Sequence, residues 1–85
     1  MELRILGVYI SDRIKEAGEV QKVLTKYGCS IKTRLGLHEV SENKCATNGL
    51  LILELTGDLK ECDKLENDLL GIKGIEVKKM TFNKQ

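Results

Sequence analysis

The sequence contains no proline and no tryptophan, and its aromatic residues are two tyrosines and one phenylalanine. It also has no low-complexity stretch that would act as a linker between domains. We therefore predict a single domain that spans residues 1–85. A chain of this length buries only about 60–65% of the surface that its unfolded form exposes, so its own core should be marginal.

The chain also lacks an excess of charge of either sign, because 14 Lys and Arg residues nearly balance 13 Asp and Glu residues. A general nucleic-acid-binding protein would carry a positive excess or a concentrated basic stripe, so this balance argues against one. No apolar run approaches the roughly 20 residues of a membrane span, and the N-terminus does not resemble a signal peptide. We therefore expect a cytoplasmic protein without a membrane partner.

Cysteine and histidine are scarce, with three cysteines and one histidine in the chain. Cys29, Cys45 and Cys62 are scattered, whereas zinc and iron–sulfur sites use about four ligands at short, paired spacings. An odd number of cysteines also fits a reducing compartment better than a disulfide scaffold. We therefore predict no metal and no cofactor, since isolated cysteines mostly behave as small apolar residues. The alternative is a metal- or redox-responsive site that uses His38 and Cys45, with Cys29 as a further ligand.

Two segments have apolar residues at the spacing of an amphipathic helix. The first follows a predicted cap at Ser11-Asp12, and its apolar stripe consists of Ile14, Ala17, Val20, Leu24 and Tyr27. Gly18 lies inside this helix at a cost of up to ~1 kcal/mol relative to alanine, so we expect the helix to cross the sheet closely there. The second follows Asp58 and Glu61, an approximate capping box, and its stripe consists of Leu59, Cys62, Leu65 and Leu69.

Four further segments have the apolar pattern of strands, at residues 3–10, 27–40, 49–56 and 75–82. The first and third are apolar on both faces, which is typical of central strands that are covered twice. In the second, alternation predicts one face with Ile31, Thr33, Leu35 and Leu37 and the other with Lys32, Arg34, Gly36 and His38. Residues 41–48 are polar and predict a hairpin connection that contains Cys45.

The order strand–helix–strand–strand–helix–strand predicts an α+β fold, the ferredoxin-like βαββαβ plait. Right-handed crossovers then give a four-stranded antiparallel sheet of order 4-1-3-2 with both helices on one face. This order places the two strands that are apolar on both faces in the centre of the sheet.

Both helices cover the same face, so the plait leaves the other face of the sheet without a cover. We predict that this face carries a contiguous apolar patch formed by Ile5, Tyr9, Leu50, Ile52 and Met80, with Phe82 near one edge. Such a patch usually marks an interaction surface, so we expect a homodimer or homotetramer. A rim of Arg34, His38 and Lys78 could hold a small anionic ligand. The alternative for the rim is a charged, solvated edge that prevents aggregation.

Four stretches of the sequence resemble a known family. They are Asp12-Arg13, Ile-Lys-Thr-Arg-Leu-Gly-Leu-His at 31–38, Gly-Leu-Leu-Ile-Leu-Glu-Leu at 49–55 and Glu-Val-Lys-Lys-Met at 76–80. In these the chain resembles the iron-only hydrogenase system regulators, small proteins with an ACT-like plait similar to the regulatory domain of the nickel-responsive repressor. The resemblance implies a small cytoplasmic regulator that oligomerises and could bind a small ligand at the subunit interface. It implies no reaction.

The residues themselves also give no support for catalysis or RNA binding. Asp12, Glu54 and His38 fall on three different predicted elements, and no nucleophile is paired with an evident base. RNA-binding plaits stack bases on aromatic residues of the first and third strands, where this chain has Tyr9 alone. We therefore predict that the protein is not an enzyme.

Overall fold

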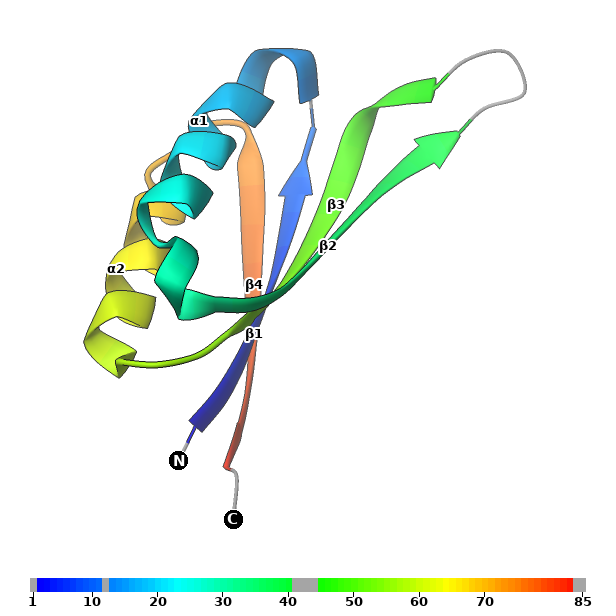
Figure 1. Ribbon diagram of the computed structural model, residues 1–85. Helices are drawn as coiled ribbons and strands as arrows, with labels where there is room; N and C mark the ends of the chain where they lie inside the picture. Colours follow the sequence, from blue (N-terminus) through cyan, green and yellow to red (C-terminus); the bar gives the residue numbers. More distant parts are fainter. Residues whose placement is uncertain (1, 12, 41–44, 84–85) are drawn as a thin grey trace.

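The computed structural model describes residues 2–11, 13–40 and 45–83. The elements along the chain are β1 (Glu2–Ile10), α1 (Arg13–Lys26), the 3₁₀ turn η1 (Gly28–Ser30), β2 (Ile31–Val40), β3 (Cys45–Leu55), α2 (Leu59–Leu70) and β4 (Ile75–Asn83) (Figure 1). The predicted order of strands and helices is therefore confirmed.

The four strands form one antiparallel sheet of order β2-β3-β1-β4, which is the predicted order read from the other edge. Figure 1 shows α1 and α2 together on one face of this twisted sheet, while the β2–β3 hairpin continues past the helix layer. The start of β1 lies beside the end of β4, where Glu2 is opposite Asn83. This arrangement is the ferredoxin-like βαββαβ plait.

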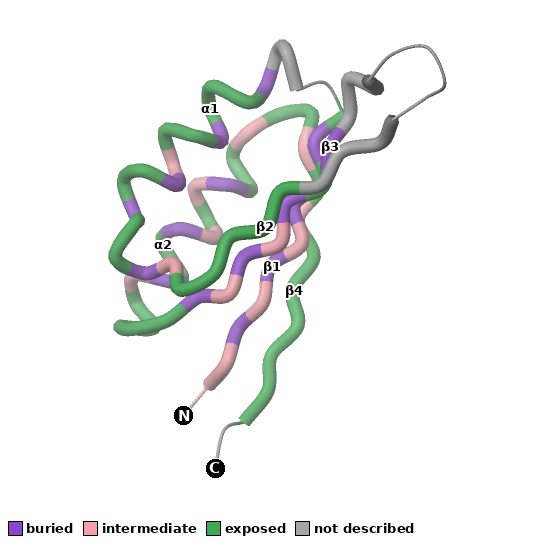
Figure 2. The backbone as a smooth tube through the Cα atoms, turned by 45° about the vertical axis from the view of Figure 1, so that its right-hand side comes forward, coloured by how far each residue is buried: buried purple, intermediate pink, exposed green. Residues whose placement is uncertain are grey.

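The hydrophobic core lies between the helices and the sheet. Along β1, buried residues alternate with partly exposed ones, so that Leu6 and Val8 face the helices (Figure 2). The buried apolar residues are Leu6, Val8, Ile10, Val20, Leu24, Tyr27, Leu51, Leu53, Leu55, Cys62, Leu65 and Leu69. Complete burial of a large apolar side chain contributes about 1.5–3 kcal/mol, so this layer holds both helices on the sheet.

The N-terminus of α2 is capped as the sequence predicts. The Asp58 side chain accepts a hydrogen bond from the backbone N–H of Lys60 at 2.9 Å, and such a cap contributes typically about 1 kcal/mol. Leu59 does not belong to the buried stripe, because it is the first residue of the helix and stays 46% exposed. Among the described residues, neither helix is long and apolar enough to cross a membrane.

The buried stripe of α1 differs from the prediction. Glu16 is buried and Ala17 is exposed. Glu16 turns inward because its carboxylate accepts a hydrogen bond from Ser11 Oγ at 3.3 Å and occupies the space beside Gly74. Gly74 has a φ of +88°, which favours glycine in this turn before β4. The expected close crossing at Gly18 is also wrong, because that glycine is exposed and a Cβ there would meet no atom within 4 Å.

The predicted second strand starts too early, and the predicted alternation of its faces fails at Ile31 and Lys32. Thr33 and Leu35 lie on the opposite face from Arg34 and Gly36, as predicted. Residues 28–30 form η1, in which the N–H of Ser30 donates to the carbonyl of Tyr27 at 2.9 Å. Ile31 is opposite Leu55, whereas Thr33 is opposite the next residue, Glu54. Two steps on β2 therefore match one step on β3, which is a β-bulge.

The bulge inserts Lys32 and reverses the side on which the following residues lie. Ile31 packs against the core, whereas Thr33 and Leu35 lie on the sheet face opposite the helices. Arg34 takes the helix side. A second irregularity separates His38 from Val40, and Val40 pairs with Cys45. Cys45 is thus the first residue of β3 and not part of a loop.

Candidate functional site

The sheet face opposite the helices carries a continuous apolar surface, which we call the open face. Its apolar side chains are Leu3, Ile5, Tyr9, Leu35, Leu50, Ile52, Met80 and Phe82, as the strand register shows. The predicted patch is therefore present on one face. The exposed fractions of Tyr9, Met80 and Phe82 are 41%, 56% and 49%, so large apolar groups remain in water. Participation of this patch in an oligomer stays a prediction.

Gly7 leaves the middle of β1 on the open face without a side chain. This residue lies between Ile52 on β3 and Lys78 on β4, and a Cβ at Gly7 would meet no atom within 4 Å. Ile5 and Tyr9 lie on either side of it along β1, on the same face.

Two pairs of opposite charges lie on the open face beside the apolar side chains. Lys32 Nζ lies 3.8 Å from Oε2 of Glu54, which is on the central strand β3 opposite Ile5, and Thr33 Oγ1 donates to Glu54 Oε1 at 3.0 Å. On the edge strand β4, Lys78 Nζ lies 3.3 Å from Glu76 Oε2. The Glu54 carboxylate therefore lies within the apolar surface and is paired there with Lys32.

The predicted rim of three cationic residues is not a single site. Arg34 points to the helix side, where its Nη2 donates to Gln21 Oε1 of α1 at 2.7 Å, because the bulge at Lys32 reverses its side. Lys78 lies on the open face of β4, at the opposite edge of the sheet. The backbone of His38 lies opposite Gly49, and its side chain is outside the described residues. Binding of an anion by any of them stays a prediction.

The described side chains contain no group of three or more His, Cys, Asp and Glu residues that could hold a metal ion. Cys29 is exposed on η1, whereas Cys62 is buried in α2 and its Sγ lies 3.5 Å from the carbonyl of Thr56. Burial raises the pKa of the Cys62 thiol, which favours its neutral form. The side chains of His38 and Cys45 are outside the described residues, so a site formed by them stays an untested alternative.

A cluster of charges around Arg4 was missed by the sequence reading. Arg4 is only 6% exposed, and its Nη1 lies 2.8 Å from Asp63 Oδ1 and 3.1 Å from Glu66 Oε1 on α2. Its Nη2 lies 3.1 Å from Glu2 Oε2. Burial alone would lower the pKa of Arg4, but hydrogen bonds to Asp63 and Glu2 outweigh this effect and raise it. The cluster ties β1 to α2, and a lone arginine in an apolar strand was its one signal in the sequence.

The plait, the helix layer on one side and the open face on the other define an ACT-like domain fold. The structure superposes on the uncharacterized protein TM1266 from Thermotoga maritima with a TM-score of 0.79, at 23% identity over 98% of this chain and 100% of that one. It superposes on the ACT domain of the GTP pyrophosphokinase of Chlorobium tepidum with a TM-score of 0.65, at 14% identity over 92% and 96% of the two chains.

CPII, a nitrogen regulatory PII-like protein from Thiomonas intermedia K12, gives a TM-score of 0.58 at 10% identity, over 100% of this chain and 97% of that one. At such low identities these similarities establish the fold alone. No family model and no curated protein matches the sequence. The ACT-like fold that the resemblance implied is confirmed, whereas membership of the hydrogenase-regulator family stays a prediction.

Proposed function

We propose that this chain is a small, non-enzymatic regulatory domain that works as a homodimer assembled through its open face. The observation that carries the proposal is the continuous apolar surface on a sheet whose other face is covered by both helices. Such a surface on a small domain usually marks an interaction site. A two-fold dimer covers two copies of it at once with one self-complementary patch.

The size of the open face fits such a dimer. A standard stable interface buries about 800 Å² per partner, which is roughly one-seventh of the 5899 Å² surface of the chain. Four strands spaced about 4.8 Å apart, with about nine residues each, give a face roughly 19 Å wide and 30 Å long before side-chain relief is counted. This flat projection of about 570 Å² lies just below the lower limit of about 600 Å² per partner for a standard interface, and side-chain relief adds to it.

The regulatory part of the proposal is supported by the fold and by the resemblance of four sequence stretches to the iron-only hydrogenase system regulators. CPII, which shares the fold, is a nitrogen regulatory protein and binds ADP, AMP and bicarbonate. A second protein with this fold is an ACT domain of a GTP pyrophosphokinase. We propose a regulatory role of the same general kind here, in which assembly at the open face and a small ligand act together. In its more specific form, the proposal is that this regulatory role is the control of an iron-only hydrogenase system.

The proposal is tested by placing a charge in the interface. Ile52→Asp and Met80→Asp put an unpaired carboxylate in the middle and near one edge of the open face, and both variants should be monomers at about 20 µM, since a buried unpaired charge opposes association strongly. Ala17→Asp adds the same charge to an exposed position of α1 and should remain dimeric. Light scattering coupled to size exclusion gives the masses. Dimers of the two sheet variants, or a monomeric Ala17→Asp variant, would contradict the open face as the interface.

A further inference from the structure

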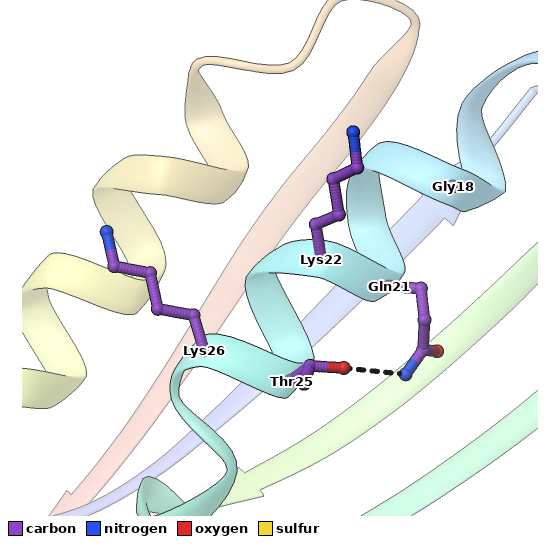
Figure 3. A pocket seen from close by; sticks show the side chains of 5 residues that line it. All are labelled: Gly18, Gln21, Lys22, Thr25 and Lys26. Carbon is purple, nitrogen blue, oxygen red and sulfur yellow. Dashed lines mark hydrogen bonds between the residues drawn. The ribbon is translucent and has the colours of Figure 1, made fainter.

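The outer surface of α1 has a hollow of about 480 Å³, lined by Gly18, Gln21, Lys22, Thr25 and Lys26. Figure 3 shows Lys22 and Lys26 along one side of it and Gln21 and Thr25 along the other. The hollow is shallow and widely open to solvent. The residues of the hollow belong to α1, which covers the face of the sheet opposite the open face (Figure 1).

Gly18 keeps one end of the hollow open, although nothing in the chain requires a glycine there. It lies inside α1, where glycine destabilises a helix relative to alanine. It is exposed, its φ is not in the left-handed region, and a Cβ would meet no atom within 4 Å. The absence of a side chain at Gly18 allows a ligand to approach the helix backbone closely.

A chain of hydrogen bonds, in which each residue donates to the next, lies along the side of the hollow that faces β2. The guanidinium of Arg34 donates through Nη2 to Gln21 Oε1 at 2.7 Å, which orients the amide. Gln21 Nε2 then donates to Thr25 Oγ1 at 3.2 Å. The Thr25 hydroxyl accepts this bond, so its own hydrogen can be donated to a ligand. A chain that begins at a cation and ends at a donor favours an anion as the next partner.

The other side of the hollow supplies positive charge on flexible side chains. Lys22 and Lys26 are one helical turn apart, so both ammonium groups can reach the same ligand. Lys22 Nζ lies 3.5 Å from Glu19 Oε1, and Lys26 Nζ lies 3.5 Å from Asp68 Oδ2. All four side chains are substantially exposed, and such pairs are weak enough to exchange partners. The methylene groups of the lysines give the hollow a largely apolar wall.

We propose that this hollow binds a small organic phosphate. The phosphate group lies between the ammonium groups of Lys22 and Lys26 and accepts a hydrogen bond from the Thr25 hydroxyl. The carbon part of the ligand lies over Gly18 and against the lysine methylenes. Lysine is a common ligand of phosphate as a point charge, and a dianion gains from both lysines together. Arg34 acts as a positioning residue, because it contacts Gln21 and not the ligand.

The test uses 1-naphthyl phosphate as the probe, titrated into the ¹⁵N-labelled full chain and followed by amide chemical shifts. We expect the largest shifts at residues 18–26 of α1. Lys22→Gln with Lys26→Gln should weaken binding about tenfold or more. Gly18→Leu should do the same, because its side chain occupies the hollow and its Cβ meets no atom within 4 Å. Inorganic phosphate should bind more weakly than the probe at the same amides, because it has no carbon part.

A matched control separates a site from simple charge attraction. Lys60→Gln with Lys64→Gln removes the same charge from the same spacing on α2, where Lys64 Nζ lies 3.0 Å from Glu61 Oε2 as Lys22 pairs with Glu19. This variant should bind the probe within about twofold of the wild type. Equal weakening by both lysine pairs, unchanged binding by Gly18→Leu, or shifts centred on the sheet would overturn the proposal. Because the hollow is remote from the open face, the monomeric Ile52→Asp variant should bind the probe as the wild type does, so the two proposals fail independently.

Discussion

At the scale of single residues, Arg4 has the most consequential position in the chain. Its guanidinium is almost completely buried near the start of β1, and it lies within hydrogen-bonding distance of carboxylates on β1 and α2. A buried arginine of this kind is stable only as long as its partners remain. Loss of the arginine would leave Asp63, Glu66 and Glu2 close together without the cation that they share.

We therefore expect Arg4→Ala to lower the free energy of unfolding by about 1–3 kcal/mol, the usual cost when a buried group loses its hydrogen-bond partners. The full cost of breaking a buried ion pair is not expected, because the Asp63 side chain is 61% exposed and Glu66 keeps Lys79 Nζ at 3.3 Å. Arg4→Lys should fall between this variant and the wild type, since it keeps the charge but loses the forked geometry. Lys60→Ala, at an exposed position of α2, serves as the control and should change stability by no more than about 0.5 kcal/mol. Urea unfolding at one fixed protein concentration measures all three. An Arg4→Ala variant as stable as the control would show that the cluster contributes nothing.

At the scale of elements, Glu16 and Lys32 mark two departures from regular periodicity. The positions of the strands and helices were predictable, because apolar residues recur at the spacing of each element and Asp58 caps α2 as expected. The bulge at Lys32 was not predictable, since no glycine marks it in the sequence. Its position depends on the pairing of Thr33 with Glu54, a long-range contact. Neither Arg34 on the helix side nor the splitting of the predicted anion-binding rim could therefore be read from alternation.

The burial of Glu16 on α1 was not predictable for a similar reason. Glu16 is charged, so periodicity places it in solvent. Its carboxylate instead lies beside Ser11 and Gly74, which are hydrogen-bonded to each other although 63 residues separate them. The five open-face residues proposed as an interface were predictable, in contrast, because they follow from strand order and the two-residue period of a strand. The hollow on α1 was not predicted, because Gly18 was explained by a close approach to the sheet.

The exposed position of Gly18 gives a prediction at this scale. Gly18→Ala should raise the free energy of unfolding by up to ~1 kcal/mol, because alanine has the higher helix propensity and its Cβ meets no atom of the chain. Gly57→Ala is the comparison at a glycine with a φ of +85°, where alanine is strained, and should lower the free energy of unfolding instead. Thermal and urea unfolding give the difference. A destabilised Gly18→Ala variant would show that the backbone at this position needs glycine for a reason within the fold.

At the scale of the whole molecule, the plait has two layers, a sheet and a helix layer that covers only one face of the sheet. Helices bury one face of the central strands, and the face with Ile5, Tyr9, Leu50, Ile52 and Met80 is left partly exposed. The chain is small, so the apolar area it leaves in water is a large share of what it could bury. Assembly through the open face covers the other side of the sheet with a second copy and adds the stability that a marginal core lacks.

The most direct test of this account is the mass of the wild-type protein in solution. Sedimentation equilibrium from about 1 to 100 µM should give twice the 9.5 kDa of one chain, with dissociation only toward the lowest concentrations, as mass action requires. A multiple of this dimer would be compatible with the open face as the first contact, provided that Ile52→Asp still yields monomers. A single species of 9.5 kDa across the whole range would contradict the account, since the open face would then remain in water.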